Sequence, residues 1–153
     1  MVSKRKRHIG IFFIIIFAFI AIGLLYSYYE ARNIKFKQMS FYSEDLPESF
    51  DGKKIVFISD THCDKYFTGD DVKKLVERFN EMKPDIILLG GDHTLINPNY
   101  SQPFFAEMGK LKSRYGVYSV LGNHDHWSDA EFIQQGLRNC GFNICDNQSY
   151  WIR

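Results

Sequence analysis

The chain has 153 residues, in which 19 lysines and arginines nearly balance 18 aspartates and glutamates, so its formal net charge is +1. Four of the basic residues precede every acidic one, which leaves fifteen basic against eighteen acidic residues and a charge of about −3 for the rest. Because a mildly acidic protein is a poor electrostatic partner for nucleic acid, we expect no nucleic-acid ligand.

The N-terminal quarter predicts a membrane anchor. An uncharged apolar segment of eighteen residues, Ile9 to Tyr26, follows the basic run Lys4 to Arg7. Eighteen residues lie at the short end of the range for a membrane-spanning helix. Tyr28 and Tyr29 follow where the second interface of the bilayer would be. A water-soluble amphipathic helix is excluded because the segment is apolar on every side.

We therefore predict a cytoplasmic basic tail over residues 1–8 and a transmembrane signal anchor over residues 9–29. Since basic residues remain on the cytoplasmic side, the chain would be a single-pass protein of the cell membrane with an extracytoplasmic domain. A cleaved signal peptide is the alternative, because Ala21 to Gly23 resembles a cleavage site. The apolar segment continues through Leu24 and Leu25, which favours the anchor.

The rest of the chain predicts an α/β domain. Residues 30–52 are predicted as a linker and a first strand, in which apolar side chains alternate only in part. Three short apolar runs then predict buried parallel strands: Ile55 to Ile58, Asp85 to Leu89 and Val117 to Leu121. Helices are predicted over residues 68–83, 103–114 and 128–138, and a further strand or hairpin over residues 142–152. Thr68 and Asp71 form a capping-box pair at the start of the first helix.

Each of the three strands is followed at once by polar side chains that can ligate a metal. They are Asp60 and His62 after the first strand, Asp92 after the second, and Asn123, His124 and Asp125 after the third. Because ligands bind at the carboxyl ends of parallel strands, we expect these side chains to meet at one edge of the sheet. If the segment after the first strand is extended, Asp60 and His62 point the same way.

These residues carry a resemblance to a known family. The strings Asp60-Thr-His62, Gly90-Gly-Asp92 and Gly122-Asn-His-Asp125 resemble the D-x-H, G-D and G-N-H-D/E motifs of the calcineurin-like metallophosphoesterases. The resemblance covers Lys53 to about Trp127 and, less sharply, the remainder. It implies a two-sheet sandwich with outer helices, of which residues 53–153 would be the N-terminal half. The expected fold is thus a partial α/β sandwich, with a mixed or parallel sheet and flanking helices, after one transmembrane helix.

The resemblance also implies the chemistry of the site. Two divalent metal ions (Mn, Fe or Zn) would activate a water that hydrolyses a phosphomonoester or phosphodiester. Asp60 and His62 would bind one ion, Asp92 would bridge both, and Asn123 would bind the other. His124 would be the catalytic residue that faces the phosphate, and Asp125 would support the ligands from behind. The anchor makes a lipid-linked or cell-envelope phosphate the expected substrate.

Two departures from the family pattern qualify this interpretation. The family has later Gly-His and Gly-His-x-His motifs, but no histidine follows His126 here. An aspartate that pairs with the motif histidine in some members is replaced by Leu95. We therefore expect the chain to be an N-terminal fragment of an enzyme. A truncated, non-catalytic membrane protein is the alternative.

Several single residues have simpler interpretations. Asp60 and Asp92 could cap the helices that follow their strands, since aspartate is a favoured cap. His93 and His126 are predicted to be partly exposed residues at the rim of the site. Cys63 is predicted to be a buried thiol, and no disulfide is predicted among the three cysteines.

Overall fold

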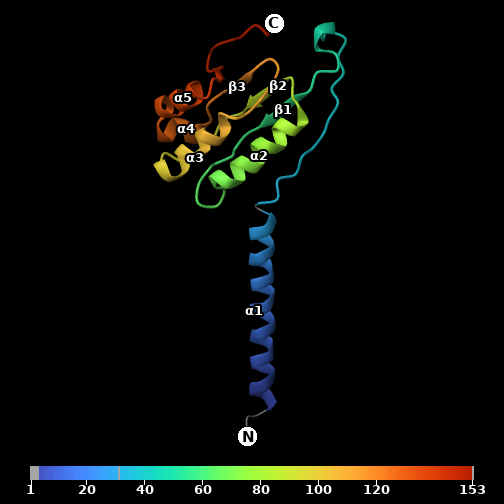
Figure 1. Ribbon diagram of the computed structural model, residues 1–153. Helices are drawn as coiled ribbons and strands as arrows, with labels where there is room; N and C mark the ends of the chain where they lie inside the picture. The colour runs from blue at the N-terminus through green and yellow to red at the C-terminus, as the bar shows by residue number, and fades with distance from the viewer. Residues whose placement is uncertain (1–3, 31, 153) are drawn as a thin grey trace. The chain divides into compact units, whose positions relative to one another are not determined.

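The computed structural model describes residues 4–30 and 32–152 (Figure 1). The chain forms two compact units, which divide after Phe41.

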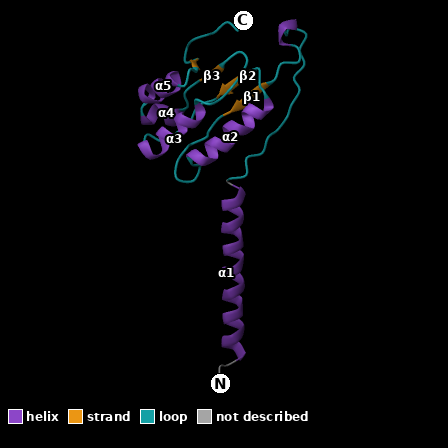
Figure 2. Cartoon of the chain, in the orientation of Figure 1, coloured by secondary structure: helices purple, strands orange, loops and turns teal. Residues whose placement is uncertain are grey.

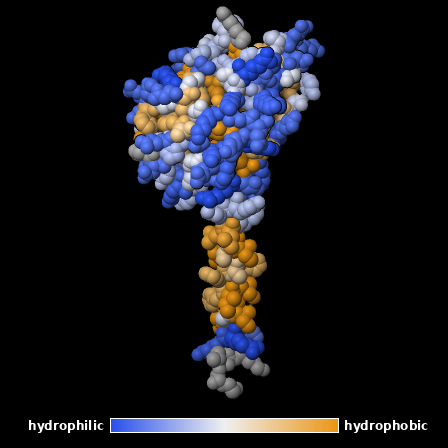
Figure 3. Space-filling model, viewed as in Figure 1, coloured by the Kyte–Doolittle hydropathy of each residue, from blue (hydrophilic) through white to orange (hydrophobic). Residues whose placement is uncertain are grey.

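The first unit is dominated by one long helix, α1 (Lys4–Glu30). Its residues 6–30 are long and apolar enough to cross a membrane. Apolar side chains cover the visible face of this helix, and hydrophilic ones gather at its N-terminal end (Figure 3). The predicted apolar helix is therefore present.

No strand forms in the described part of residues 30–52, so the predicted first strand is wrong. Residues 32–41 are neither helix nor strand, and the following segment contains only a 3₁₀ turn, Glu48–Phe50. The apolar side chains of the linker are exposed, as Phe36 and Phe41 show. A strand is stable only when a neighbour pairs with it, and here the sheet begins later in the chain.

The second unit is built on a four-stranded parallel sheet. Its strands are β1 (Ile55–Ile58), β2 (Ile86–Leu89), β3 (Val117–Ser119) and β4 (Asn143–Ile144), side by side in chain order. The register pairs Ile58 with Leu89 and Leu89 with Ser119, so the strands end level with one another. The three predicted strands are confirmed. The fourth is a short parallel strand rather than a hairpin.

Helices connect the strands and cover one face of the sheet (Figure 2). They are α2 (Gly69–Met82), α3 (Pro98–Met108), α4 (Asn123–Ser128) and α5 (Ala130–Asn139). Side chains such as Leu75, Phe104 and Leu137 pack on Ile87 and Val117 to form the core. On the other face of the sheet Ile55 and Phe57 are exposed. The α/β class and the partial sandwich with flanking helices are confirmed.

The helix boundaries differ from the prediction in two places. The helix predicted from residue 103 begins at Pro98, because the side chain of Asn97 accepts a hydrogen bond from the N–H of Asn99 (2.9 Å), and it ends at Met108. The helix predicted from residue 128 begins at Ala130, where Asp129 accepts from the N–H of Phe132 (3.0 Å). The short helix α4 before it was not predicted, because six residues are too few to show an apolar period.

Candidate metal centre

The segments that follow β1 and β2 remain paired beyond the strands. The N–H groups of Asp60, His62 and Cys63 donate to the carbonyls of Gly91, Asp92 and His93, each at 3.0 Å. The hydroxyl of Thr61 also donates to the carbonyl of His93 (2.8 Å). The first two motifs are thus held side by side at the carboxyl edge of the sheet.

The backbone within these segments is not extended. Asp60, His62 and Asp92 all have left-handed backbone angles, with φ of 57°, 41° and 55°. The argument that Asp60 and His62 point the same way by strand alternation is therefore wrong. Aspartate and histidine tolerate this conformation better than most side chains, and such strained positions cluster at functional sites.

Three of the predicted site residues converge on one point. One nitrogen or oxygen atom each from His62, Asp92 and His124 lies within 4.8 Å of the other two. The Nε2 atom of His62 lies 3.6 Å from Oδ2 of Asp92 and 3.9 Å from Oδ1 of Asp60. The side chain of Asp92 is 9% exposed, whereas that of Asp60 is 64% exposed. Carboxylate oxygens and imidazole nitrogens at this spacing suit manganese, iron or zinc.

The side chain of Asp92 has two different partners. Its Oδ1 atom accepts a hydrogen bond from the N–H of His124 (2.9 Å), and its Oδ2 atom faces His62. Asp92 therefore does cap a helix, but the helix is α4 rather than α3, which follows its own strand and is capped by Asn97. One oxygen remains for a metal. Asn123, the first residue of α4, is exposed beside His124.

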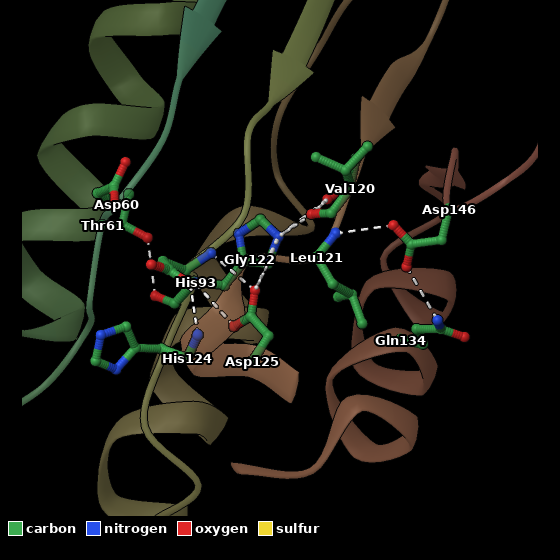
Figure 4. A network of polar contacts seen from close by, with 12 residues as sticks. Asp60, Thr61, His93, Val120, Leu121, Gly122, His124, Asp125, Gln134 and Asp146 are labelled. Atoms are coloured by element: carbon green, nitrogen blue, oxygen red, sulfur yellow. Dashed lines mark hydrogen bonds and ion pairs between the residues drawn. The ribbon is translucent and has the colours of Figure 1, made fainter. Parts of the chain in front are cut away.

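Asp125 is fully buried, and Figure 4 shows its carboxylate between His93 and Gly122. Its Oδ2 atom accepts from the N–H groups of Asp92 (2.8 Å) and Gly122 (2.9 Å), and its Oδ1 atom accepts from the N–H of His93 (3.0 Å). One carboxylate thus joins the segment after β2 to the turn after β3. Glycine is required at Gly122, since a Cβ atom there would lie 2.0 Å from Oδ1 of Asp92.

His93 is buried, so the prediction of a partly exposed rim residue is wrong. Its side chain is 3% exposed, and its Nε2 atom lies 3.0 Å from both the carbonyl oxygen of Val120 and the hydroxyl of Ser119. Burial lowers the pKa of His93, although the nearby carboxylate of Asp125 acts in the opposite direction. The paired segment turns Asp92 toward the site and its neighbour His93 inward. By contrast His126, on α4, is exposed.

Two further observations concern residues near the site. Asp146, which no sequence motif singled out, accepts from the N–H of Leu121 (3.0 Å) and from the side-chain amide of Gln134 (3.1 Å), as Figure 4 shows. It thereby fixes the turn that leads into Gly122.

Cys63 is a buried thiol, as predicted, and burial raises its pKa to about 11. All three cysteines are free.

Comparison with known proteins agrees with the motifs. The sequence profile described as calcineurin-like phosphoesterase matches residues 53–151. The chain is 34% identical over 117 residues to "Uncharacterized metallophosphoesterase YkuE" of Bacillus subtilis, covering 74% of this chain and 41% of that protein. It is 30% identical over 105 residues to "Transmembrane protein with metallophosphoesterase domain" of Danio rerio, covering 68% and 24%.

A third relative is "Phosphodiesterase YaeI" of Escherichia coli, which is 28% identical over 100 residues, with 63% of this chain and 37% of that protein covered. No solved structure matches the chain. The chain therefore spans between about a quarter and two fifths of the length of these three relatives.

Proposed function

Since the chain belongs to the calcineurin-like phosphoesterase family, we propose that the protein is a membrane-anchored, metal-dependent phosphoesterase. Its substrate would be a phosphomonoester or a phosphodiester, and its cofactors two divalent ions of manganese, iron or zinc. The convergence of His62, Asp92 and His124 within 4.8 Å carries this proposal.

The ligands divide between the two ions as follows in this proposal. Asp60 and His62 bind the first ion, Asp92 contributes to both, and Asn123 binds the second. When bound, such ions lower the pKa of water and act as Lewis acids toward phosphoryl oxygens. The distances from His62 to Asp60 and Asp92 support the first ligand pair and its link to the bridging carboxylate.

His124 is proposed to act on the substrate itself. Its backbone N–H is fixed by Asp92, while its side chain is exposed at the edge of the cluster. Its ring also packs edge-on against that of His62, with 4.7 Å between the ring centroids. An imidazole held in this way can donate a proton to the leaving oxygen of a phosphate ester. Asp125 holds the backbone of both motifs from behind.

The location of the protein is proposed from α1 and its flanking residues. The helix would cross the cell membrane once, with the basic tail in the cytoplasm and the phosphoesterase domain outside it. The printed name of the Danio rerio relative, which includes "Transmembrane protein", supports a membrane location. A lipid-linked or cell-envelope phosphate would then be the accessible substrate.

The proposed function is tested by Asp92→Asn in the complete protein. This variant keeps an oxygen that accepts from His124, but it removes the negative charge that a bridging ligand needs. We expect kcat/KM for a nitrophenyl phosphodiester to fall by about 100-fold or more. Asp129→Asn, at the exposed start of α5, is the matched control and should retain activity, because asparagine caps a helix as well as aspartate.

Unchanged turnover in Asp92→Asn would contradict the two-metal proposal. If the unmodified complete protein hydrolyses no phosphate ester at any concentration of manganese or zinc, the non-catalytic alternative would replace it.

A further inference from the structure

An exposed tryptophan stands beside the ligand cluster. Trp127 lies on α4, three residues after His124, and its side chain is exposed, at 75% of the residue's accessible surface. Its ring centroid lies 4.9 Å from that of His124, with the two planes inclined at 60°. The ring of His124 in turn contacts that of His62. A continuous set of three rings therefore leads from the candidate metal ligands to an indole open to solvent.

The described core does not require a tryptophan at this position. The buried residue of α4 is Asp125, and Trp127 is not part of the hydrophobic core of the domain. Exposing a large aromatic ring forgoes the free energy that its burial would provide. Tryptophan is enriched at binding interfaces, and an exposed indole offers a face on which another aromatic ring can pack.

We propose that Trp127 determines specificity by stacking against the organic group of the phosphate ester, and that the site prefers esters whose organic group is a flat ring. This inference rests on the proposed function, which places the phosphate at His62, Asp92 and His124. The organic group of a phosphate ester is joined to the phosphorus through a single oxygen atom. With the phosphate beside His124, a ring on the ester oxygen falls within reach of the indole, whose centroid is 4.9 Å from the imidazole.

The test measures binding without chemistry. Phenylphosphonate and methylphosphonate carry the same phosphonate group, but only the first has a ring, and neither contains an ester bond that could be hydrolysed. In the complete protein, Trp127→Ala should raise the dissociation constant of phenylphosphonate, measured by titration calorimetry, by about 3- to 10-fold, the range for an aromatic pair. The constant for methylphosphonate should not change. Trp127→Phe should restore most of the loss, because phenylalanine keeps a ring.

Trp151 provides the matched control, since it is the other tryptophan of the chain and is 90% exposed. Trp151→Ala should leave both dissociation constants unchanged. An equal rise of both constants in Trp127→Ala would overturn the inference, because the residue would then act only by positioning His124. No change in either constant would overturn it as well.

Turnover separates this inference from the proposed function. Hydrolysis of phenyl phosphate by the unmodified protein is measured in parallel. A protein that hydrolyses no ester, but binds phenylphosphonate through Trp127, would support the ring-binding role while contradicting the phosphoesterase. An active protein with no ring selectivity at Trp127 would overturn the inference alone.

Discussion

The first turns of α2 and α4 contain the same local hydrogen bond, but the aspartate that accepts it has different further partners in the two helices. In each, an aspartate three residues into the turn accepts from the N–H of the residue before the helix: Asp71 from Thr68 (3.1 Å) and Asp125 from Gly122 (2.9 Å). Asp71 also accepts hydrogen bonds from the hydroxyl of Thr68 and the ammonium of Lys74, and both residues are close to it in sequence.

Asp125 instead accepts hydrogen bonds from two further backbone N–H groups, those of Asp92 and His93, which lie 33 and 32 residues away in sequence. It is also fully buried, whereas Asp71 is only partly so. The comparison shows that the same capping carboxylate can also hold a second segment in place when the backbone of that segment lies close to it. At α4 this second segment is the one that follows β2. Local stability at α2 and the geometry of the candidate metal centre beside α4 should therefore respond differently to the same substitution.

The largest expected effect is that of Asp125→Ala. It leaves three backbone N–H groups without their acceptor, at a position where the carboxylate is fully buried. We expect a loss of about 3 to 5 kcal/mol in the free energy of unfolding of the complete protein, measured with urea. The affinity for Mn²⁺, measured by titration calorimetry, should fall as well.

Asp125→Asn is the graded control for this variant. It keeps one acceptor oxygen and should lose less than the alanine variant. If Asp125→Ala cost under about 1 kcal/mol, the carboxylate would be no more than a local cap, and the comparison with Asp71 would fail.

Asp71→Ala should have a smaller and purely local effect. We expect a loss of about 1 kcal/mol, the usual value for a helix cap, with no change in the affinity for Mn²⁺. A loss of metal affinity in this variant would show that α2 is coupled to the site.

The contribution of Asp71 to the free energy of unfolding should also depend on pH. Burial alone would raise the pKa of Asp71, but hydrogen bonds from the N–H and hydroxyl of Thr68 and from Lys74 outweigh it, and the pKa is lowered. The folded protein therefore favours the ionised carboxylate. Its stabilisation is present above the ordinary carboxyl pKa of about 3.9 and is lost as the pH falls through the lower value of the folded state.

Unfolding measured with urea from pH 6 down to pH 3 checks this dependence. The difference in stability between the unmodified protein and Asp71→Ala should narrow below about pH 4. A difference that stays constant over this range would contradict the assigned role of the carboxylate.

The sequence predicted what depends on neighbouring residues. The capping box joins Thr68 to Asp71, three positions further along the chain, and β1, β2 and β3 follow from apolar runs, so both could be predicted. The meeting of His62, Asp92 and His124 could also be predicted, because the carboxyl ends of parallel strands share one edge. Their assignment to two ions stays a prediction.

The sequence did not predict what depends on the turned backbone or on distant partners. The left-handed angles at Asp60 and His62 break the alternation that an extended chain would have. The pairing of the segments after β1 and β2 turns His93 inward, where its Nε2 atom lies within hydrogen-bond distance of the carbonyl of Val120 and the hydroxyl of Ser119. The bonds from Asp125 to the segment after β2 join residues far apart in sequence, and no local pattern encodes them.

The smallest expected effect is that of Gln134→Ala, at the end of the hydrogen-bond network around the candidate site. Gln134, on α5, donates to Asp146 (3.1 Å), and the other oxygen of Asp146 accepts from Leu121 (3.0 Å). Gln134→Ala removes the bond to Asp146 and an exposed one that Arg138 donates to Gln134 (3.3 Å) but leaves the bond to Leu121 in place, so we expect a loss of about 0.5 to 1 kcal/mol and a change of less than about twofold in Mn²⁺ affinity. Asp146→Ala, which also frees the N–H of Leu121, should cost more in both measurements. If Gln134→Ala weakened metal binding as strongly as Asp125→Ala, then α5 would belong to the assembly that shapes the site, and the contrast between a local cap and a long-range one would have to include a third helix.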